Sequence, residues 1–322
     1  MILVMGGAGY IGSHATKHLL DNGYEVVVAD NLVYGHRQAV DARAQFCHAD
    51  LLDTFSLQKL FATYHIDAVI HFAAFAYVGE SVAEPGKYYN NNVVGTINLL
   101  NVMQAFGVGK IIFSSTCATY GEPRYTPIDE RHPQLPINPY GRSKLMIEQL
   151  FADYGRAYGL KYIALRYFNA AGCSDDADIG ESHTPETHLI PFVLKAINGE
   201  RDVVKIFGTD YDTPDGTCIR DYIHVEDLAL AHRLALEKLD GFSGGLNLGI
   251  GVGTSVREII ATAEKVSGQK CPVEYAPRRP GDPAKLFADK RKAEEILGWT
   301  PQYTGMEDII RTAWNWEKNR KF

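Results

Sequence analysis

The sequence contains little that would tie this 322-residue chain to disulfides, membranes or nucleic acids. Its five cysteines are scattered, odd in number and without a Cys-x-x-Cys pair, so neither a disulfide framework nor a zinc site is indicated. No run of about eighteen apolar residues occurs, and no basic leader precedes the first apolar segment, so we expect a cytoplasmic protein. The net charge of −7 leaves no basic excess for nucleic acid or an anionic membrane.

Familiar metal-binding spacings are missing as well. The eleven histidines include no His-Glu-x-x-His pair, and the acidic run at 175–178 lacks the glycine and glutamate of a calcium loop. We therefore predict no metal site. With 46% hydrophobic and 22% charged residues and no low-complexity tract, the composition is typical of a fully folded globular chain.

A glycine-rich turn follows the first apolar strand, Ile2–Met5. Gly6, Gly9 and Gly12 allow the backbone to approach a pyrophosphate, which would lie at the N-terminus of the next helix. Asp30 ends the second strand, where its carboxylate can accept hydrogen bonds from the adenosine ribose and would repel a 2′-phosphate. This order of strand, turn, helix, strand and acid predicts NAD, rather than NADP, as the cofactor.

The alternation of strands and helices continues through the first half of the chain. Apolar strands are predicted at 25–29, 44–47, 68–72, 110–113 and 162–165, and each ends in small or polar residues. We predict an α/β fold with a Rossmann-type doubly wound parallel sheet at 1–170, which some later segments rejoin. A smaller C-terminal α/β domain at 171–322 would mainly bind the substrate.

Tyr140 and Lys144 are candidate catalytic residues. Asn138 and Pro139 predict the start of a helix, and residues four apart on a helix share one face. The ammonium of Lys144 would then stabilise the phenolate of Tyr140 and make it usable near neutral pH. Because chance often produces this spacing, the pair needs support from the rest of the chain.

Two predicted helices, at 88–106 and 139–158, carry more apolar residues than one buried stripe requires. We expect them to pair with their counterparts in a homodimer. Packing beneath another loop of the same subunit is the alternative.

The glycine turn, Asp30, Thr116, Tyr140 and Lys144 occur in the order that is typical of the extended short-chain dehydrogenase/reductase superfamily. Within it, nearly the whole chain resembles the UDP-glucose 4-epimerases. The most specific similarity lies in the segments Arg166-Tyr167-Phe168-Asn169, Arg220-Asp221-Tyr222-Ile223-His224-Val225 and Ala276-Pro277-Arg278-Arg279-Pro280-Gly281-Asp282. The resemblance implies an isomerase that interconverts UDP-galactose and UDP-glucose through a 4-keto intermediate, by reversible hydride transfer to tightly bound NAD.

The resemblance also implies roles for individual residues. Tyr140 would remove the proton of the sugar 4-hydroxyl, Lys144 would hold the phenolate and the nicotinamide ribose, and Thr116 would hydrogen-bond the 4-oxygen. Besides the three glycines, the NAD site would include Tyr10, Ile11, Asp30, Asn31, Asp50, Leu51, Phe72, Ala73, Asn92, Thr116, Tyr140, Lys144 and Phe168. The UDP-sugar would contact Thr116, Tyr140, Asn169, His188, Leu189, Phe207, Arg220, Arg279, Asp282 and Leu286. The two arginines suit a diphosphate, because guanidinium groups make paired hydrogen bonds to its oxygens.

Three positions depart from the family pattern. Ala76 stands where some epimerases have a lysine near the cofactor, which leaves open how tightly NAD is held. His188 replaces an asparagine near the substrate phosphates, so that contact is open too. Leu286 stands where members with a narrow sugar pocket carry tyrosine, and we hypothesise that UDP-N-acetylhexosamines are accepted as well.

The same residues bear on other possible functions. A 4,6-dehydratase would carry Asp-Glu after the threonine, whereas this chain has Cys117-Ala118, neither of which is a carboxylic acid, so the elimination would lack its catalysts. UDP-glucuronate epimerases are harder to exclude and stay as the alternative. A non-catalytic dinucleotide-sensing protein could dispense with Tyr140 and Lys144, which makes it a minor alternative.

Overall fold

The structure is a computed structural model that describes residues 1–279 and 281–322. Its main sheet has seven parallel strands in the order β10-β6-β5-β4-β1-β2-β3. The strands are Ile2–Met5 (β1), Val26–Asp30 (β2), Gln45–His48 (β3), Ala68–His71 (β4), Lys110–Thr116 (β5), Lys161–Tyr167 (β6) and Gly244–Leu248 (β10). The direction of winding reverses at β1, so the predicted doubly wound Rossmann fold is confirmed.

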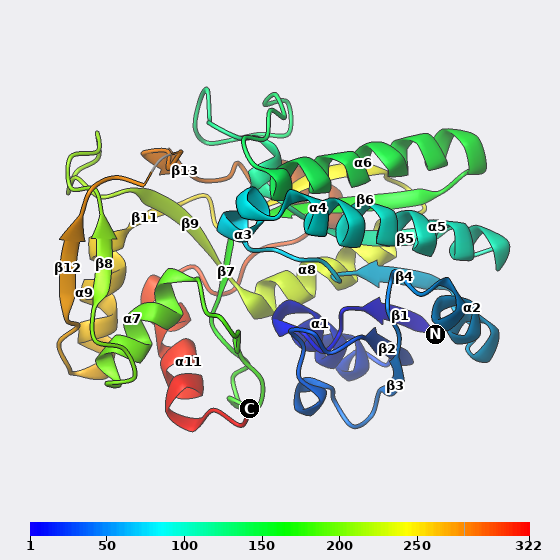
Figure 1. Cartoon of the computed structure of the whole chain (residues 1–322), viewed down its shortest axis with the longest axis horizontal. Helices are drawn as coiled ribbons and strands as arrows, with labels where there is room; N and C mark the ends of the chain where they lie inside the picture. Colours follow the sequence, from blue (N-terminus) through cyan, green and yellow to red (C-terminus); the bar gives the residue numbers. More distant parts are fainter. Residues whose placement is uncertain (280) are drawn as a thin grey trace.

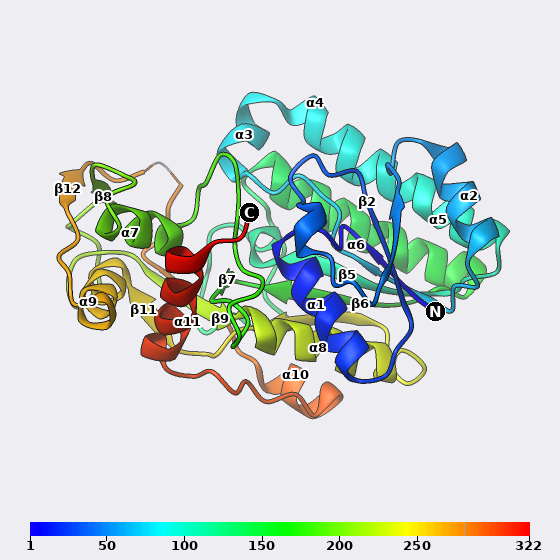
Figure 2. The same ribbon diagram turned by 90° about the horizontal axis from the view of Figure 1, so that it is seen from below.

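Helices cover both faces of this sheet, because its central strands are buried on both sides. On one face lie α1 (Tyr10–Asp21) and α8 (Val225–Lys238), which pack side by side (Figure 2). Leu228 and Ala231 of α8 share a core there with Val28 and Ile112 of the strands. The other face is covered by α2 (Thr54–Thr63), α5 (Gly95–Ala105) and α6 (Pro139–Tyr158).

A second region, at the left of Figure 1, contains two smaller sheets. In one, β9 (Ile219–His224) pairs with β7 (Asn169–Ala171), β11 (Gly253–Ser255) and β13 (Lys285–Leu286). In the other, β8 (Val204–Phe207) pairs with β12 (Val273–Ala276). Helices α7 (Leu189–Ile197), α9 (Val256–Ser267) and α11 (Met306–Asn319) share a core with β8. The short helices α3 (Val78–Ala83), α4 (Pro85–Tyr88) and α10 (Arg291–Leu297) lie nearer the main sheet.

The chain passes between the two regions more than once. After β9 it returns to the main sheet as α8 and β10, then leaves again for β11 and α9. These are the later segments that rejoin the first region, although the division at residue 170 itself stays a prediction. No helix in the described part of the chain is long and apolar enough to cross a bilayer.

Helix α6 begins and ends where the sequence predicts. The side chain of Asn138 accepts a hydrogen bond from the Gly141 amide at 2.8 Å, Pro139 occupies the first turn, and Gly159 ends the helix with φ +75°. The helix predicted at 88–106 is confirmed, and over Tyr89–Val94 it is wound as a π-helix, a local detail that the sequence did not indicate. In that segment the buried Asn92 bonds to the Phe75 backbone and to Ser143 rather than facing solvent.

Candidate active site

A cavity of about 1050 Å³ lies between the carboxyl ends of the main sheet and the second region. Most of the predicted site residues line it. On the cofactor side these are Gly6, Gly9, Tyr10, Ile11, Gly12, Asp30, Asn31, Leu51, Phe72, Ala73 and Phe168; at the centre are Thr116, Tyr140 and Lys144; on the substrate side are Asn169, His188, Leu189, Phe207, Arg220, Arg279, Asp282 and Leu286. Ala76 lines it too, while Asp50 and Asn92 are not among its lining residues.

The glycine turn is shaped to hold a phosphate group. A Cβ on Gly12 would lie 2.3 Å from the Gly6 carbonyl oxygen, and one on Gly6 would lie 2.5 Å from the Ala73 nitrogen, so neither position tolerates a side chain. At Gly9 a Cβ would meet only the Gly6 carbonyl oxygen, at 3.5 Å, so this residue borders open space. Because Gly9 is also the N-cap of α1, no side chain occupies the end of that helix.

Asp30 is held at the end of β2 with its carboxylate only partly used. Its Oδ2 accepts from the Ala8 amide at 3.0 Å and its Oδ1 from the Leu32 amide at 2.8 Å. Burial raises the pKa of this carboxyl, while the backbone donors lower it. Each oxygen keeps a lone pair, so the ribose hydroxyls of NAD fit here as donors.

Asp50 and Asn92 do not line the cavity but bond to residues that do. Asp50 accepts a 2.8 Å hydrogen bond from the Asn31 side chain, which itself lines the cavity. The Asn92 amide is used by the backbone of Phe75, at 2.9 and 3.0 Å, and by Ser143. Direct contact of Asn92 with NAD, as the family resemblance implied, is therefore not favoured by this geometry.

The three predicted catalytic residues meet at the centre of the cavity. Thr116 ends β5, while Tyr140 and Lys144 lie in the first turns of α6. The Lys144 ammonium donates to the Ser114 carbonyl at 2.7 Å and lies 6.0 Å from the centre of the Tyr140 ring. A tyrosine, an ammonium and a hydroxyl in this arrangement can remove a proton from a hydroxyl group of a sugar and return it.

Burial shifts the pKa of both members of the pair. It raises the pKa of Tyr140 to about 12, against the lowering effect of a hydrogen bond with Thr116. It lowers the pKa of Lys144 to about 7, against the raising effect of the Glu148 charge. Both shifts favour the neutral forms, so the charge of the lysine is finely balanced near neutral pH.

The two predicted phosphate-binding arginines are held on the opposite wall. Arg220 donates to the Ile219 and Pro283 carbonyls, both at 2.8 Å, and to Asp282 at 2.7 Å. The guanidinium of Arg279 stacks 4.4 Å from the centre of the Phe207 ring. Both side chains line the cavity and bring permanent positive charge to it.

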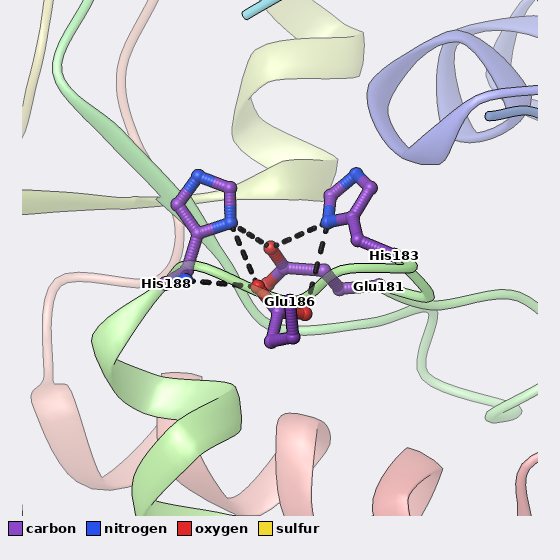
Figure 3. A group of neighbouring side chains, drawn as sticks. All are labelled: Glu181, His183, Glu186 and His188. Atoms are coloured by element: carbon purple, nitrogen blue, oxygen red, sulfur yellow. Dashed lines mark hydrogen bonds and ion pairs between the residues drawn. The ribbon is translucent and has the colours of Figure 1, made fainter. Parts of the chain in front are cut away.

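One group of polar residues was not predicted as a group from the sequence, although its member His188 was a candidate substrate contact. Glu181, His183, Glu186 and His188, in the loop before α7, converge at the edge of the cavity (Figure 3). The four residues lie in an irregular loop, and the intervals between them in the sequence match no familiar metal motif. The sequence therefore predicted no metal site. The only signal was the density of histidine and glutamate within eight residues.

Comparison with known proteins identifies the family of this chain. Residues 2–251 match the family described as the NAD dependent epimerase/dehydratase family. The chain belongs to this family. It is 55% identical over 319 residues to a UDP-glucose 4-epimerase of Halalkalibacterium halodurans, an alignment covering 98% of this chain and 95% of the relative.

Solved structures of other epimerases superpose on nearly the whole chain. The UDP-glucose 4-epimerase of Brucella ovis in complex with NAD has a TM-score of 0.95 and 53% identity, covering 98% of this chain and 97% of that one. The UDP-Glc/GlcNAc 4-epimerase of Campylobacter jejuni has a TM-score of 0.87 and 45% identity, covering 98% of each chain. Membership of this NAD-dependent family confirms the predictions of an isomerase and of NAD as its cofactor.

Proposed function

We propose that this chain interconverts UDP-galactose and UDP-glucose by inverting C4 of the hexose, using NAD that it retains. The observation that carries the proposal is a single cavity that joins the glycine turn, the Tyr140–Lys144 pair and two arginines. Similarity to UDP-glucose 4-epimerases over nearly the whole chain supports it.

Each part of the cavity has a task in the proposed reaction. Bound NAD supplies reversible hydride acceptance at C4. Tyr140 acts as a phenolate, which the Lys144 ammonium has to stabilise against the burial that raises the tyrosine pKa. This phenolate takes the proton of the 4-hydroxyl and returns it, while Thr116 holds the 4-oxygen. Arg220 and Arg279 anchor the diphosphate, which leaves the hexose free to present either face of C4. The hydride taken from C4 returns to C4, so the reaction needs no external oxidant.

The proposal is tested by incubating untagged protein with UDP-galactose, UDP-N-acetylgalactosamine and UDP-glucuronate without added NAD, and separating the products by chromatography. We expect UDP-glucose from UDP-galactose, and a loss of kcat of about 100-fold or more in Tyr140→Phe. Tyr158→Phe is the matched control, because Tyr158 is on the same helix but is 59% exposed. Turnover of UDP-glucuronate alone would instead assign the alternative function, and no turnover with added NAD would refute both.

We also propose that the sugar pocket accepts N-acetylated UDP-hexosamines. Leu286 lines the cavity beside Phe168 and Cys117, where a tyrosine would fill more space. Similarity to the UDP-Glc/GlcNAc 4-epimerase of Campylobacter jejuni supports this breadth. We expect Leu286→Tyr to reduce UDP-N-acetylgalactosamine turnover selectively, with UDP-galactose turnover nearly unchanged. Equal losses on both substrates would argue against the assignment.

A homodimer built on α5, the π-helix and α6 is a further part of the proposal. The Tyr154 hydroxyl on α6 donates to Asn101 on α5 at 2.9 Å, so the two helices form one surface (Figure 1). Val94, Met146 and Tyr158 are 43%, 42% and 59% exposed on these helices. Sedimentation should give a dimer that Met146→Glu weakens, whereas Val273→Glu, on a distant strand, should leave it intact. A wild-type monomer at micromolar concentration would contradict this assembly.

A further inference from the structure

The loop between β7 and α7 brings four metal-ligating side chains to one point (Figure 3). One ligand atom from each of Glu181, His183, Glu186 and His188 lies within 4.8 Å of every other. The His188 Nδ1 is 2.7 Å from a Glu181 oxygen and 3.2 Å from a Glu186 oxygen. The His183 Nδ1 is 3.3 and 3.7 Å from oxygens of the same two carboxylates. Both imidazoles therefore turn the same ring nitrogen toward both acids.

Among the residues that the structure describes, each of the two buried carboxylates has one oxygen without a hydrogen bond, while Glu186 Oε1 accepts from the backbone amides of Thr187 and His188 at 2.6 and 2.8 Å. The side chains of Glu181 and Glu186 are only 7% and 5% exposed. Within the described part of the chain, Glu181 Oε1, Glu186 Oε2 and His183 Nδ1 make no hydrogen bond of acceptable geometry. Two buried carboxylates this close repel each other unless positive charge lies between them. His188 is close enough to pair with both carboxylates, but the ligand atoms of all four residues also converge on one shared point, which is how ligands surround a cation.

We propose that Glu181, His183, Glu186 and His188 bind one Zn²⁺ ion. Two imidazole nitrogens and two carboxylate oxygens are a donor set that suits zinc, and four protein ligands complete its preferred tetrahedral coordination. The ion balances the charge of the two carboxylates. Because all four positions are filled by the protein, this is a structural site rather than a catalytic one.

The location gives the ion a task in shaping the cavity. The His183 ring packs edge-on against Tyr10 and Tyr77, with ring centres 6.3 and 6.4 Å apart, on the cofactor side. His188 is the N-cap of α7, on the substrate side. Zinc bound here ties these two walls together through one loop. The site is assigned from these residues alone and does not depend on the proposed epimerase activity.

The test measures metal directly on the untagged full chain purified without chelators. We expect about one zinc per chain by mass spectrometry of the metal content. After chelator treatment, Zn²⁺ titrated against a chromophoric competitor should bind at one site, and Co²⁺ should give the visible absorption bands of tetrahedral coordination. His183→Gln and Glu186→Gln should each weaken Zn²⁺ binding by at least about tenfold.

Matched variants separate this site from adventitious binding. His65→Gln and Glu84→Gln change exposed residues of the same types and should keep one zinc per chain. Circular dichroism checks that each variant is folded. Wild-type protein that retains no zinc and shows no saturable Zn²⁺ binding overturns the proposal, as does binding that is equal in the cluster variants and the controls.

Discussion

Lys144 is a cation in a wall that favours neutral groups. Its side chain is among the largest that are fully buried, with 2% exposed, and its ammonium donates to the Ser114 carbonyl. Burial lowers its pKa to about 7. Below that pH the folded protein therefore carries a buried positive charge that destabilises it relative to the unfolded chain. The proposed reaction needs that charge beside Tyr140, whereas folding alone would be better served by an apolar side chain.

We predict that Lys144→Met stabilises the NAD-free protein while abolishing epimerisation. The folded pKa lies below the ordinary value of 10.5, so between about pH 7 and 10.5 the unfolded chain binds more protons, and wild-type stability rises with pH. The penalty is complete below about pH 7. Relative to wild type, the Tm of the variant should therefore be higher by roughly 2–4 °C near pH 6 and by less near pH 9.

Calorimetry on both proteins at the two pH values checks this prediction. Lys59→Met, at an exposed position of α2, is the control and should leave the Tm within about 1 °C at both pH values. A Lys144→Met variant that is less stable than wild type near pH 6 would mean that the ammonium contributes more through its hydrogen bond than burial costs it.

At the scale of elements, a buried polar network joins α6 to the strands beneath the site. Arg166 on β6 pairs with Glu148 on α6 at 2.5 Å, and both side chains are 8% exposed. Arg166 also donates to the Tyr120 hydroxyl at 2.9 Å, which donates in turn to Asn247 on β10 at 2.6 Å. The network fixes the helix that carries Tyr140 and Lys144 against the sheet.

Breaking this network on one side only should be costly. Glu148→Leu leaves the Arg166 guanidinium buried without its carboxylate, and we expect a loss of about 3–5 kcal/mol in the free energy of unfolding. Adding Arg166→Met removes the orphaned charge and should recover much of that loss. Urea unfolding of the two single variants and the double variant measures the coupling. Strictly additive losses would show that the two side chains act independently.

Elements that depend on local sequence could be predicted, whereas those set by distant contacts could not. Asn138, Pro139 and Gly159 mark the ends of α6 with their own side chains or backbone, so its bounds follow from the sequence. The π-helix at Tyr89–Val94 depends on Asn92 bonding to Ser143, 51 residues away. Strand β13 exists only because Lys285 and Leu286 pair with β9. No local pattern encodes such pairings.

The same contrast holds within the site. Tyr140 and Lys144 could be proposed from the sequence only because the glycine turn, Asp30 and Thr116 supported a spacing that chance often produces, and the structure brings these residues to one cavity. Asp50 and Asn92 were assigned by resemblance; neither is among the residues that line the cavity, and their contact with NAD stays a prediction. The Glu181–His188 cluster was missed because an irregular loop, not a helix or strand, brings its members together.

At the scale of the whole molecule, the cavity is closed by two regions with separate contributions. The first region contributes the glycine turn after β1 and, from α6, Tyr140 and Lys144. The second region contributes Arg279 from the segment after β12. Its neighbour Arg278 is identical in charge but points elsewhere, pairing with Asp210 at 2.7 Å. These adjacent arginines separate the effect of position from that of charge.

We predict that Arg279→Ala weakens UDP binding and raises the KM for UDP-galactose, with kcat nearly unchanged. A lost hydrogen bond between charged groups costs about 1.5–3 kcal/mol, which corresponds to roughly 10- to 150-fold in affinity. The diphosphate lies away from C4 and is held alike before and after the reaction, so the loss should fall on KM rather than on kcat.

Calorimetric titration with UDP and steady-state kinetics measure the two quantities, with Arg278→Ala as the control. The Arg278–Asp210 pair is exposed, at 47% and 73%, so its loss should change UDP affinity by less than about threefold. Equal effects of the two substitutions would mean that the arginines act only through the general positive charge of this segment. If only Arg279→Ala weakens UDP binding, the diphosphate binds beside Arg279 and Phe207. The second region would then hold the nucleotide.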